Sequence, residues 1–279
     1  MAENILEQGL GSLVPVLSEW YNCQLVVELR NYGEMLFCRE GSKQIMKLSI
    51  MQPYYFPYIA YFQLIKAVDK FVIYDNIQFT KSGWFRRNRL LDNGKEKLFT
   101  IPVKKDSHYL NVAQRELAGN FDLESKTILR RIEATYRKAP RYKKVMPVVG
   151  ECFQRGSGNL FQFIYTSLLL LLRFLEIDTD IIKSSSIDID CALKGQDRVL
   201  AIAKSLNADI YINAIDGQKL YSREVFRNEG MELNFINTKP IVYRQFGDKF
   251  IPGLSIIDVM MFNSREQIKG YLNHYNLLD

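Results

Sequence analysis

Apolar and polar positions follow two different periods along most of this 279-residue chain. Short runs rich in β-forming apolar residues predict buried strands, and longer stretches with apolar residues three and four positions apart predict helices. From residue 46 onward the two patterns alternate. We expect strands at 48–51, 70–74, 98–103, 180–183, 209–213 and 232–236, and helices at 57–67, 123–138, 142–154, 159–176, 196–206 and 256–262.

This alternation predicts an α/β fold in which a mostly parallel sheet is flanked by helices. Three of the expected helices follow one another between residues 123 and 176, and they form a helical middle segment. The most apolar of them, at 159–176, is too short to span a bilayer and contains Arg173. We therefore interpret it as a buried core helix.

Residues 1–45 do not continue the pattern. None of the expected sheet strands lies there, and the segment ends just before Met46, where the first strand pattern starts. We therefore divide the chain into an N-terminal extension, residues 1–45, and an α/β domain, residues 46–279.

Positive charge is concentrated in two segments of a chain whose net charge is +6. Between residues 81 and 105 eight basic side chains accompany two acidic ones, and between 126 and 144 eight accompany one. Such clusters suit phosphate groups on a nucleotide, a carrier or a nucleic acid. The alternative is a solvated helix face.

Polar side chains follow two of the expected strands at their carboxyl ends, the edge at which open α/β sheets bind ligands. Gln52 ends the first strand, Asp75 ends the second, and Lys81 follows closely. We predict that these three residues are catalytic. Asp75 is the expected general base, because neighbouring cations favour its ionised form. The alternative is that Asp75 caps the following turn.

A substrate-binding surface is predicted around the same edge. Trp84 offers an aromatic face, and the guanidinium groups of Arg86 and Arg89 can each bind a phosphate through two hydrogen bonds. Another expected strand ends just before the turn at Asp216, which brings further polar groups to this edge. The predicted substrate-binding residues are Tyr54, Gln78, Trp84, Arg86, Asn88, Arg89, Asp216, Gln218 and Tyr221. Core packing is the alternative for the tyrosines between positions 54 and 61.

Two residues near the C-terminus have expected structural roles. Ser255 directly precedes the helix at 256–262 and is expected to cap it. Asp258 lies inside that apolar helix, where a carboxylate needs a polar partner.

Several known signatures are absent from the sequence. It has no GxxxxGK phosphate loop, no GxGxxG after the first strand and no GxSxG elbow. The four cysteines form no CxxC pair and there are two histidines, so we expect neither a metal site nor a cofactor. Cys152 and Cys191 have no evident histidine partner, which disfavours a thiol nucleophile.

The start of the chain shows no secretory leader pattern, and together with free thiols this predicts a cytoplasmic protein.

Four separated segments carry a resemblance to a known family. They are QPYYFPYIAYF from Gln52, VDKFVIYDNIQFTKSGWFRRNR from Val68, INAIDGQKLY from Ile212 and FIPGLSIIDVMMFN from Phe250. In this order they resemble the WbqC-like family, over about residue 46 to the C-terminus, and the resemblance does not cover residues 1–45. This chain has Ala60 where members often have glycine, and Asp216-Gly217 where they often have a paired glycine. Neither difference removes a side chain that could carry out chemistry.

The resemblance implies a setting in bacterial O-antigen, lipopolysaccharide and capsule biosynthesis, where sugars are decorated as nucleotide-linked precursors. The expected function is a transferase that modifies a nucleotide-linked amino sugar by acyl or aminoacyl transfer, with an acyl donor or carrier as its second partner. One alternative is nucleotidyl or adenylyl transfer, although the His-x-Gly-His expected for it is missing. Another is non-enzymatic binding of an anionic ligand or RNA. Neither a membrane span nor nucleic acid as the main partner is expected.

Overall fold

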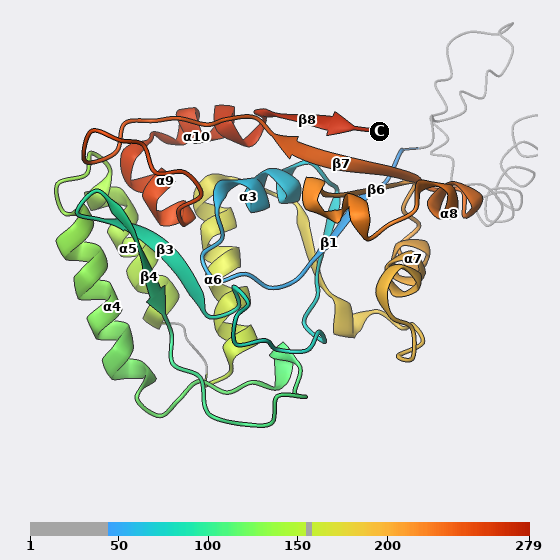
Figure 1. Cartoon of the computed structure of the whole chain (residues 1–279), viewed down its shortest axis with the longest axis horizontal. Coiled ribbons are helices and arrows are strands. Elements are labelled where there is room, and N and C mark those ends of the chain that lie inside the picture. Colours follow the sequence, from blue (N-terminus) through green and yellow to red (C-terminus); the bar gives the residue numbers. More distant parts are fainter. Residues whose placement is uncertain (1–43, 155–157) are drawn as a thin grey trace, which may run out of the picture. The chain divides into compact units, whose positions relative to one another are not determined.

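Strands and helices are interspersed along the chain from β1 onward, with three helices, α4 to α6, in succession in the middle (Figure 1). The computed structural model describes residues 44–154 and 158–279, so residues 1–43 of the predicted extension lie outside the described part. The main sheet is formed by β1 (Lys47–Met51), β2 (Lys70–Ile73), β5 (Asp180–Lys183), β6 (Ile210–Ala214), β7 (Glu232–Thr238) and β8 (Tyr275–Leu278). The helices are α3 (Ile59–Lys66), α4 (Phe121–Tyr136), α5 (Tyr142–Gln154), α6 (Leu160–Leu175), α7 (Gly195–Ser205), α8 (Arg223–Asn228), α9 (Ile256–Phe262) and α10 (Arg265–Leu272).

The sheet has the order β5-β2-β1-β6-β7-β8, and only β8 runs antiparallel to its neighbour. This confirms the predicted α/β fold with a mostly parallel sheet. From β1 the chain first extends the sheet through β2 and β5, and it then returns to build the other half from β6 onward. The strand order therefore reverses between β1 and β6, which is where open α/β sheets bind their ligands.

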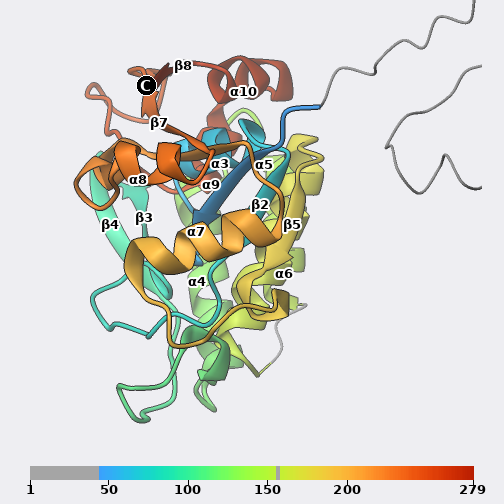
Figure 2. The ribbon, with the colours of Figure 1, turned by 90° about the vertical axis from the view of Figure 1, so that its right-hand side faces the viewer.

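Side chains from successive strand positions pack on opposite faces of the sheet. Leu48 and Ile50 of β1 belong to one core cluster together with residues of α7 and α8. Phe71 and Ile73 of β2 belong to a larger cluster that includes residues of α3, α6 and α10. Figure 2 shows α7 lying across one face of the sheet. Helices thus cover both faces, and each fully buried Leu, Ile or Phe contributes about 1.5–3 kcal/mol to the stability.

The helical middle segment consists of α4, α5 and α6, close to the expected positions. Ile128, Ile132 and Tyr136 form the buried face of α4, as their spacing predicts. In α6, Asn159 caps the first turn by accepting from the N–H of Gln162, and the helix is largely buried, which confirms the interpretation as a core helix. No helix within residues 44–154 and 158–279 has the length and apolar composition of a membrane span.

A β-hairpin replaces the strand that was expected at 98–103. The strand β4 covers Lys95–Thr100 and pairs antiparallel with β3 (Arg87–Asp92) in a separate two-stranded sheet. Asn93 and Gly94 form the turn with φ angles of 51° and 72°, the left-handed backbone typical of tight hairpin turns. The prediction missed β3 because its sequence RNRLLD is mostly polar, although Asn88 and Leu90 are buried.

Other differences concern the ends of elements. Pro57 lies before α3 and its N-cap Tyr58, outside the helix that was expected to begin there. The helices α8 and α10 and the strand β8 were not expected. The start of α10 does carry a signal, because Ser264 and Gln267 form a capping box across one turn.

Candidate functional site

The candidate site lies at the carboxyl ends of β1 and β6, where the strand order reverses. The two strands pair only through their first two residues: Lys47 pairs with Ile210, and Leu48 pairs with Tyr211. The ladder between the two strands is therefore short, and the loops that follow them diverge at this edge. We call this edge the rim.

The loop that follows β1, residues 52–58, is fixed by buried anchors. Tyr55 and Phe56 are fully buried, and Phe56 adopts a φ of 44°, which is uncommon outside glycine. The side-chain amide of Asn88 donates to the carbonyls of both residues. The hydroxyl of Ser255 donates to the Phe56 carbonyl at 2.9 Å. These contacts hold the backbone, so Tyr54 and Tyr58 remain half-buried at the surface.

An aromatic and cationic platform forms beside this loop. The rings of Tyr54 and Trp84 are stacked with 5.7 Å between centroids and 4° between planes. The guanidinium carbons of Arg87 and Arg89 lie 5.3 Å and 5.2 Å from the centroid of the Trp84 ring. Burial and the neighbouring Tyr58 raise the pKa of Tyr54, and the two arginines partly oppose this increase. The platform therefore combines stacked rings with two guanidinium groups over the Trp84 ring, a combination that suits a ring linked to phosphate.

The two arginines predicted to bind phosphate both have partners within the protein. Arg89 donates to the Glu96 carboxylate at 2.8 Å and to the Gly253 carbonyl at 3.2 Å. Arg86 donates to the carbonyl of Ile101 at 3.4 Å, and burial lowers its pKa with a further contribution from the adjacent positive charge. Their role as phosphate ligands stays a prediction, and Asn88 has the structural role of anchoring the loop.

Asp216 lies on the other side of the rim in η3 (Ile215–Lys219), which replaces the expected turn. Its carboxylate is exposed, and it is close enough to Tyr58 to raise the pKa of that phenol in addition to the effect of burial. The position of η3 is fixed by Gly217, because a Cβ there would lie 3.0 Å from Nδ2 of Asn213. Asp216 has no hydrogen bond or ion pair to its carboxylate from any residue in 44–154 or 158–279.

Tyr58 connects the platform to Asp216. Its ring centroid lies 5.9 Å from that of Tyr54, which in turn stacks on Trp84. The predicted residues Tyr54, Trp84, Arg89 and Asp216 are thus brought to one rim. Sequence reasoning missed Arg87 and Tyr58 as members of this site, although both belong to the motifs that carry the family resemblance.

Asp75 has a different environment from the one expected. It is 3% exposed, and its carboxylate accepts from the Ser184 hydroxyl at 2.8 Å, the Ser185 amide at 2.9 Å and the Ser185 hydroxyl at 2.6 Å. These serines belong to η2 (Ser184–Ser186), which follows β5. The contacts join the ends of β2 and β5, a structural role that differs from the expected cap of the turn after Asp75. The role of Asp75 as a general base stays a prediction.

The remaining predicted residues are more exposed. The carbonyl of Gln52 accepts from the Tyr61 hydroxyl, while its side chain is solvent-exposed. Gln78 donates to the carbonyl of His108 at 3.0 Å and holds a loop rather than the rim. Lys81 and Gln218 are exposed. The ring of Tyr221 packs edge-on against Tyr211, with 5.7 Å between centroids.

Asp258 has the polar partners that its position requires. It is fully buried and accepts from the hydroxyls of Tyr136 at 2.9 Å and Tyr243 at 2.7 Å, and from Nε2 of Gln245 at 2.8 Å. Burial raises its pKa, and these three hydrogen bonds partly offset the increase. Ser255 caps α9 as expected, because its hydroxyl accepts from the N–H of Ile257. This network connects α4, α9 and the segment 243–251 beneath the hairpin.

Three of the four motif segments thus meet in the fold, with the loop after β1 and the start of β3 joined through Asn88, and both joined to Ser255. The WbqC-like protein family matches residues 52–270, which includes all four segments. The chain belongs to the WbqC-like protein family.

A relative of this WbqC-like chain is the uncharacterized protein Rv1507c of Mycobacterium tuberculosis (strain ATCC 25618 / H37Rv). The two are 24% identical over 230 residues, which covers 82% of this chain and 98% of the relative. No solved structure gives a significant match.

Neither thiol in the described part of the WbqC-like chain is placed for nucleophilic chemistry at the rim. Cys152 is buried, and burial raises its pKa to about 12. Cys191 is exposed and its thiol bonds to the carbonyl of Ile189. Within residues 44–154 and 158–279, no group of three or more His, Cys, Asp or Glu side chains is arranged to hold a metal ion.

Proposed function

We propose that this WbqC-like protein is a transferase of bacterial surface-polysaccharide biosynthesis that modifies a nucleotide-linked amino sugar by acyl or aminoacyl transfer. The observation that carries the proposal is the arrangement of residues at the rim. A stacked Tyr54–Trp84 pair, a cationic edge and an exposed carboxylate meet where the order of the parallel strands reverses. This is the position at which α/β folds bind nucleotides.

The platform supports recognition of the nucleotide. The ring of a base or sugar would stack against the half-buried pair of Tyr54 and Trp84, and the diphosphate would lie against the guanidinium of Arg87. Arg87 suits this role because only one hydrogen bond of its guanidinium is described, to the carbonyl of Ser82. Arg89 holds the platform through Glu96 and Gly253 and adds positive charge.

Asp216 is the proposed general base. Its carboxylate is exposed beside Tyr58, whereas three donors already occupy that of Asp75. In the proposed step the sugar amine attacks the acyl carbon of an ester or thioester donor, and Asp216 accepts the amine proton. A C–N bond forms, the bond from the acyl carbon to the leaving group breaks, and the leaving group departs with the electron pair and takes up the proton.

Binding can be tested through the fluorescence of Trp84. The chain has two tryptophans, so a Trp20→Phe background leaves Trp84 as the sole indole. Titration with a panel of UDP-linked and dTDP-linked amino sugars should quench this signal. A Trp84→Ala variant, followed by calorimetry, should lose about 1–3 kcal/mol of binding free energy, the contribution typical of a stacked base. A Trp84→Phe variant retains the flat surface and should bind within a small factor of the wild type.

Activity can be tested by mass spectrometry of the nucleotide sugar after incubation with acyl thioesters or aminoacyl esters. A mass increase equal to the acyl group, located on the sugar amine, is the expected result. Release of pyrophosphate from a nucleoside triphosphate would instead identify a nucleotidyl transferase. If no member of the panel binds the Trp20→Phe protein, the proposal is wrong at its first step.

A further inference from the structure

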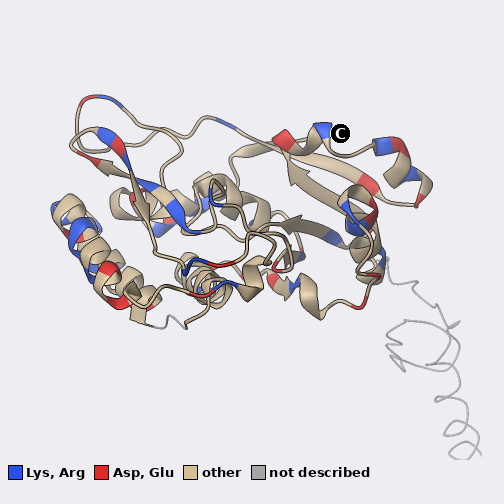
Figure 3. Ribbon diagram, turned by 60° about the horizontal axis from the view of Figure 1, so that its bottom comes forward, with Lys and Arg blue, Asp and Glu red and all other residues tan. Residues whose placement is uncertain are grey.

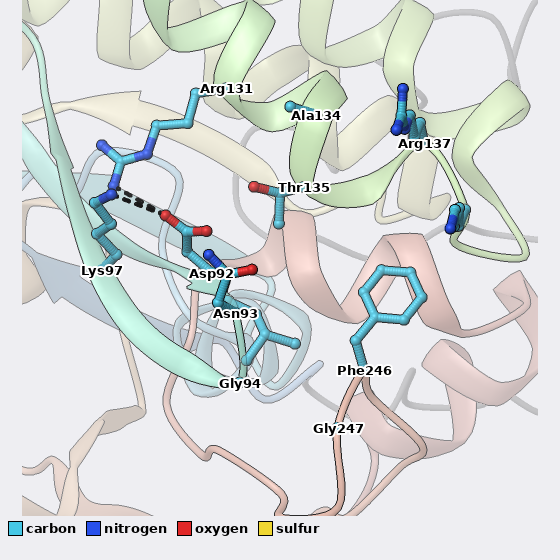
Figure 4. Close-up of a pocket in the computed structure, with 12 residues that line it drawn as sticks. Asp92, Asn93, Gly94, Lys97, Arg131, Ala134, Thr135, Arg137, Phe246 and Gly247 are labelled. Atoms are coloured by element: carbon cyan, nitrogen blue, oxygen red, sulfur yellow. Dashed lines mark ion pairs between the residues drawn. The ribbon is translucent and has the colours of Figure 1, made fainter.

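A groove of about 860 Å³ lies between the turn of the β3–β4 hairpin and α4, and the segment at Phe246 and Gly247 closes one side of it (Figure 4). Arg131 and Ala134 line it from α4, one turn apart, and Arg137 and Lys138 line it from the turn that directly follows the helix. The hairpin supplies Asp92 and Lys97 from the opposite side. The rim lies at the other end of this hairpin, because β3 runs from Arg87 to Asp92 over about 16 Å.

The groove is strongly cationic. Its lining has four basic side chains, those of Lys97, Arg131, Arg137 and Lys138, and one carboxylate, that of Asp92. Asp92 is already paired, at 2.9 Å to Lys97 and at 3.7 Å to Arg131 (dashed lines in Figure 4). Figure 3 shows basic residues along α4, the helix at the left of that view.

Part of this positive charge has no partner within the described chain. Nη2 of Arg131 is buried without a hydrogen bond and lies 3.7 Å from the Asp92 carboxylate, while Nη1 donates to the carbonyl of Leu98. The side chains of Arg137 and Lys138 make no hydrogen bond or ion pair with any residue in 44–154 or 158–279. Arg137 and Lys138 therefore present positive charge with which a bound anion could pair.

The other component of the groove is apolar. The ring of Phe246 points toward α4 from the far side in Figure 4 and is held edge-on against Phe262, with 4.8 Å between centroids. Leu91 and Ala134 add apolar surface. A Cβ at Gly247 would lie 3.7 Å from Cα of Gly94, so the loop and the hairpin turn approach closely at this end.

We infer that this groove is a second ligand site, which binds an organic phosphate with an apolar or aromatic body. The phosphate would lie among Arg131, Arg137 and Lys138, and the body would pack on Phe246. Guanidinium groups favour phosphate because they present two parallel donors to its oxygens. The inference does not rest on the proposed function, because no residue of the rim lines the groove.

Calorimetric titration of the full chain with phenyl phosphate tests the inference. The double variant Arg137→Glu/Lys138→Glu should bind at least about tenfold more weakly, since a hydrogen bond to a charged group is worth about 1.5–3 kcal/mol. The matched control is Lys126→Glu/Arg130→Glu, which makes the same charge change on α4 outside the groove lining. This control should bind within about twofold of the wild type. Equal losses in both double variants would mean diffuse electrostatic attraction and would overturn the inference.

Two further measurements separate the parts of the site. Phe246→Leu should weaken phenyl phosphate binding but leave the affinity for inorganic pyrophosphate unchanged, because pyrophosphate has no body to pack on the ring. Trp84→Ala, which removes the aromatic surface of the rim, should leave both titrations unchanged. Phenyl phosphate binding that depends on Trp84 would place the ligand at the rim instead. Binding of single-stranded RNA that both double variants weaken would assign α4 to a nucleic-acid surface and would also overturn the inference.

Discussion

The ring of Tyr54 lies parallel to that of Trp84, with 5.7 Å between their centroids and 4° between their planes. Tyr54 belongs to the loop after β1, and Trp84 lies just before the hairpin, so the pair joins the main sheet to an element outside it. The backbone confirms this connection, because the N–H of Tyr55 donates to the carbonyl of Trp84 at 3.1 Å. The rim therefore depends on the hairpin as much as on the strands.

Arg89 should matter through its shape as well as its charge. Arg89→Lys retains the charge but removes the planar group that contacts Trp84, Glu96 and Gly253. We expect nucleotide-sugar affinity, measured by calorimetry, to fall by about tenfold while the net charge is unchanged. Arg173→Lys, at an exposed ion pair with Glu151, is the control and should bind like the wild type. Indistinguishable binding by Arg89→Lys would remove this residue from the site.

Much of the main sheet follows from the sequence alone because its strands and helices have clear periods. The expected helix 142–154 and strand 180–183 coincide with α5 and β5. The hairpin was missed because β3 has the sequence RNRLLD, in which the two leucines are the only apolar residues, too few to give a strand pattern. Its turn did carry a signal, since Asn93-Gly94 is a sequence that favours tight hairpins.

The site was harder to predict than the fold, for a physical reason. The end of a strand indicates which edge a side chain approaches, but its partners depend on which strand lies beside it. β2 lies next to β5, so Asp75 meets Ser184 and Ser185 rather than cations. β6 lies next to β1, so Asp216 is near Tyr58. The order of strands across a sheet is a long-range property that no local pattern contains.

Two carboxylates can be compared directly as candidate bases. Asp216→Asn should retain the melting temperature and lower turnover by about two to four orders of magnitude, the usual contribution of a general base. Asp75→Asn should lower the free energy of unfolding by about 1–3 kcal/mol, because an amide cannot accept from all three serine donors. Turnover of the remaining folded Asp75→Asn protein should be close to that of the wild type. The reverse pattern, with a stable but inactive Asp75→Asn protein, would assign the base to Asp75.

Asp258 should give the stability of the protein a distinctive pH dependence. Burial raises the pKa of this carboxyl above its ordinary value of 3.8, so the folded state binds the proton more tightly than the unfolded chain does. Stability from this source is full below the unfolded pKa and is lost as pH rises through the higher folded pKa. Asp258→Asn does not titrate, so its stability should lack this pH-dependent contribution.

The measurement for Asp258 is urea unfolding of the wild type and Asp258→Asn between about pH 4 and pH 7, the range above the usual carboxyl pKa. The unfolding free energy of the wild type should fall relative to that of Asp258→Asn as pH rises. Asp248→Asn changes an exposed carboxylate in the adjacent segment and should follow the wild-type curve. A difference that is constant across the range would show that Asp258 has the same pKa in the folded and unfolded states.

Residues 46–279 should fold without the preceding segment. β1 begins at Lys47 and lies in the interior of the sheet between β2 and β6, so the domain requires the chain from about this point. The backbone nitrogen of Met46 donates to the Asp209 carboxylate at 2.9 Å, and in a chain that starts at Met46 the α-amino group would take this position. We expect a cooperative thermal transition within about 4 °C of that of the full chain, the shift that about 1 kcal/mol produces in a domain of this size.

A chain that starts at residue 52 lacks β1 and should not fold, which makes it the control. Aggregation of 46–279, or a much larger drop in melting temperature, would mean that residues 1–45 contribute to the stability of the domain.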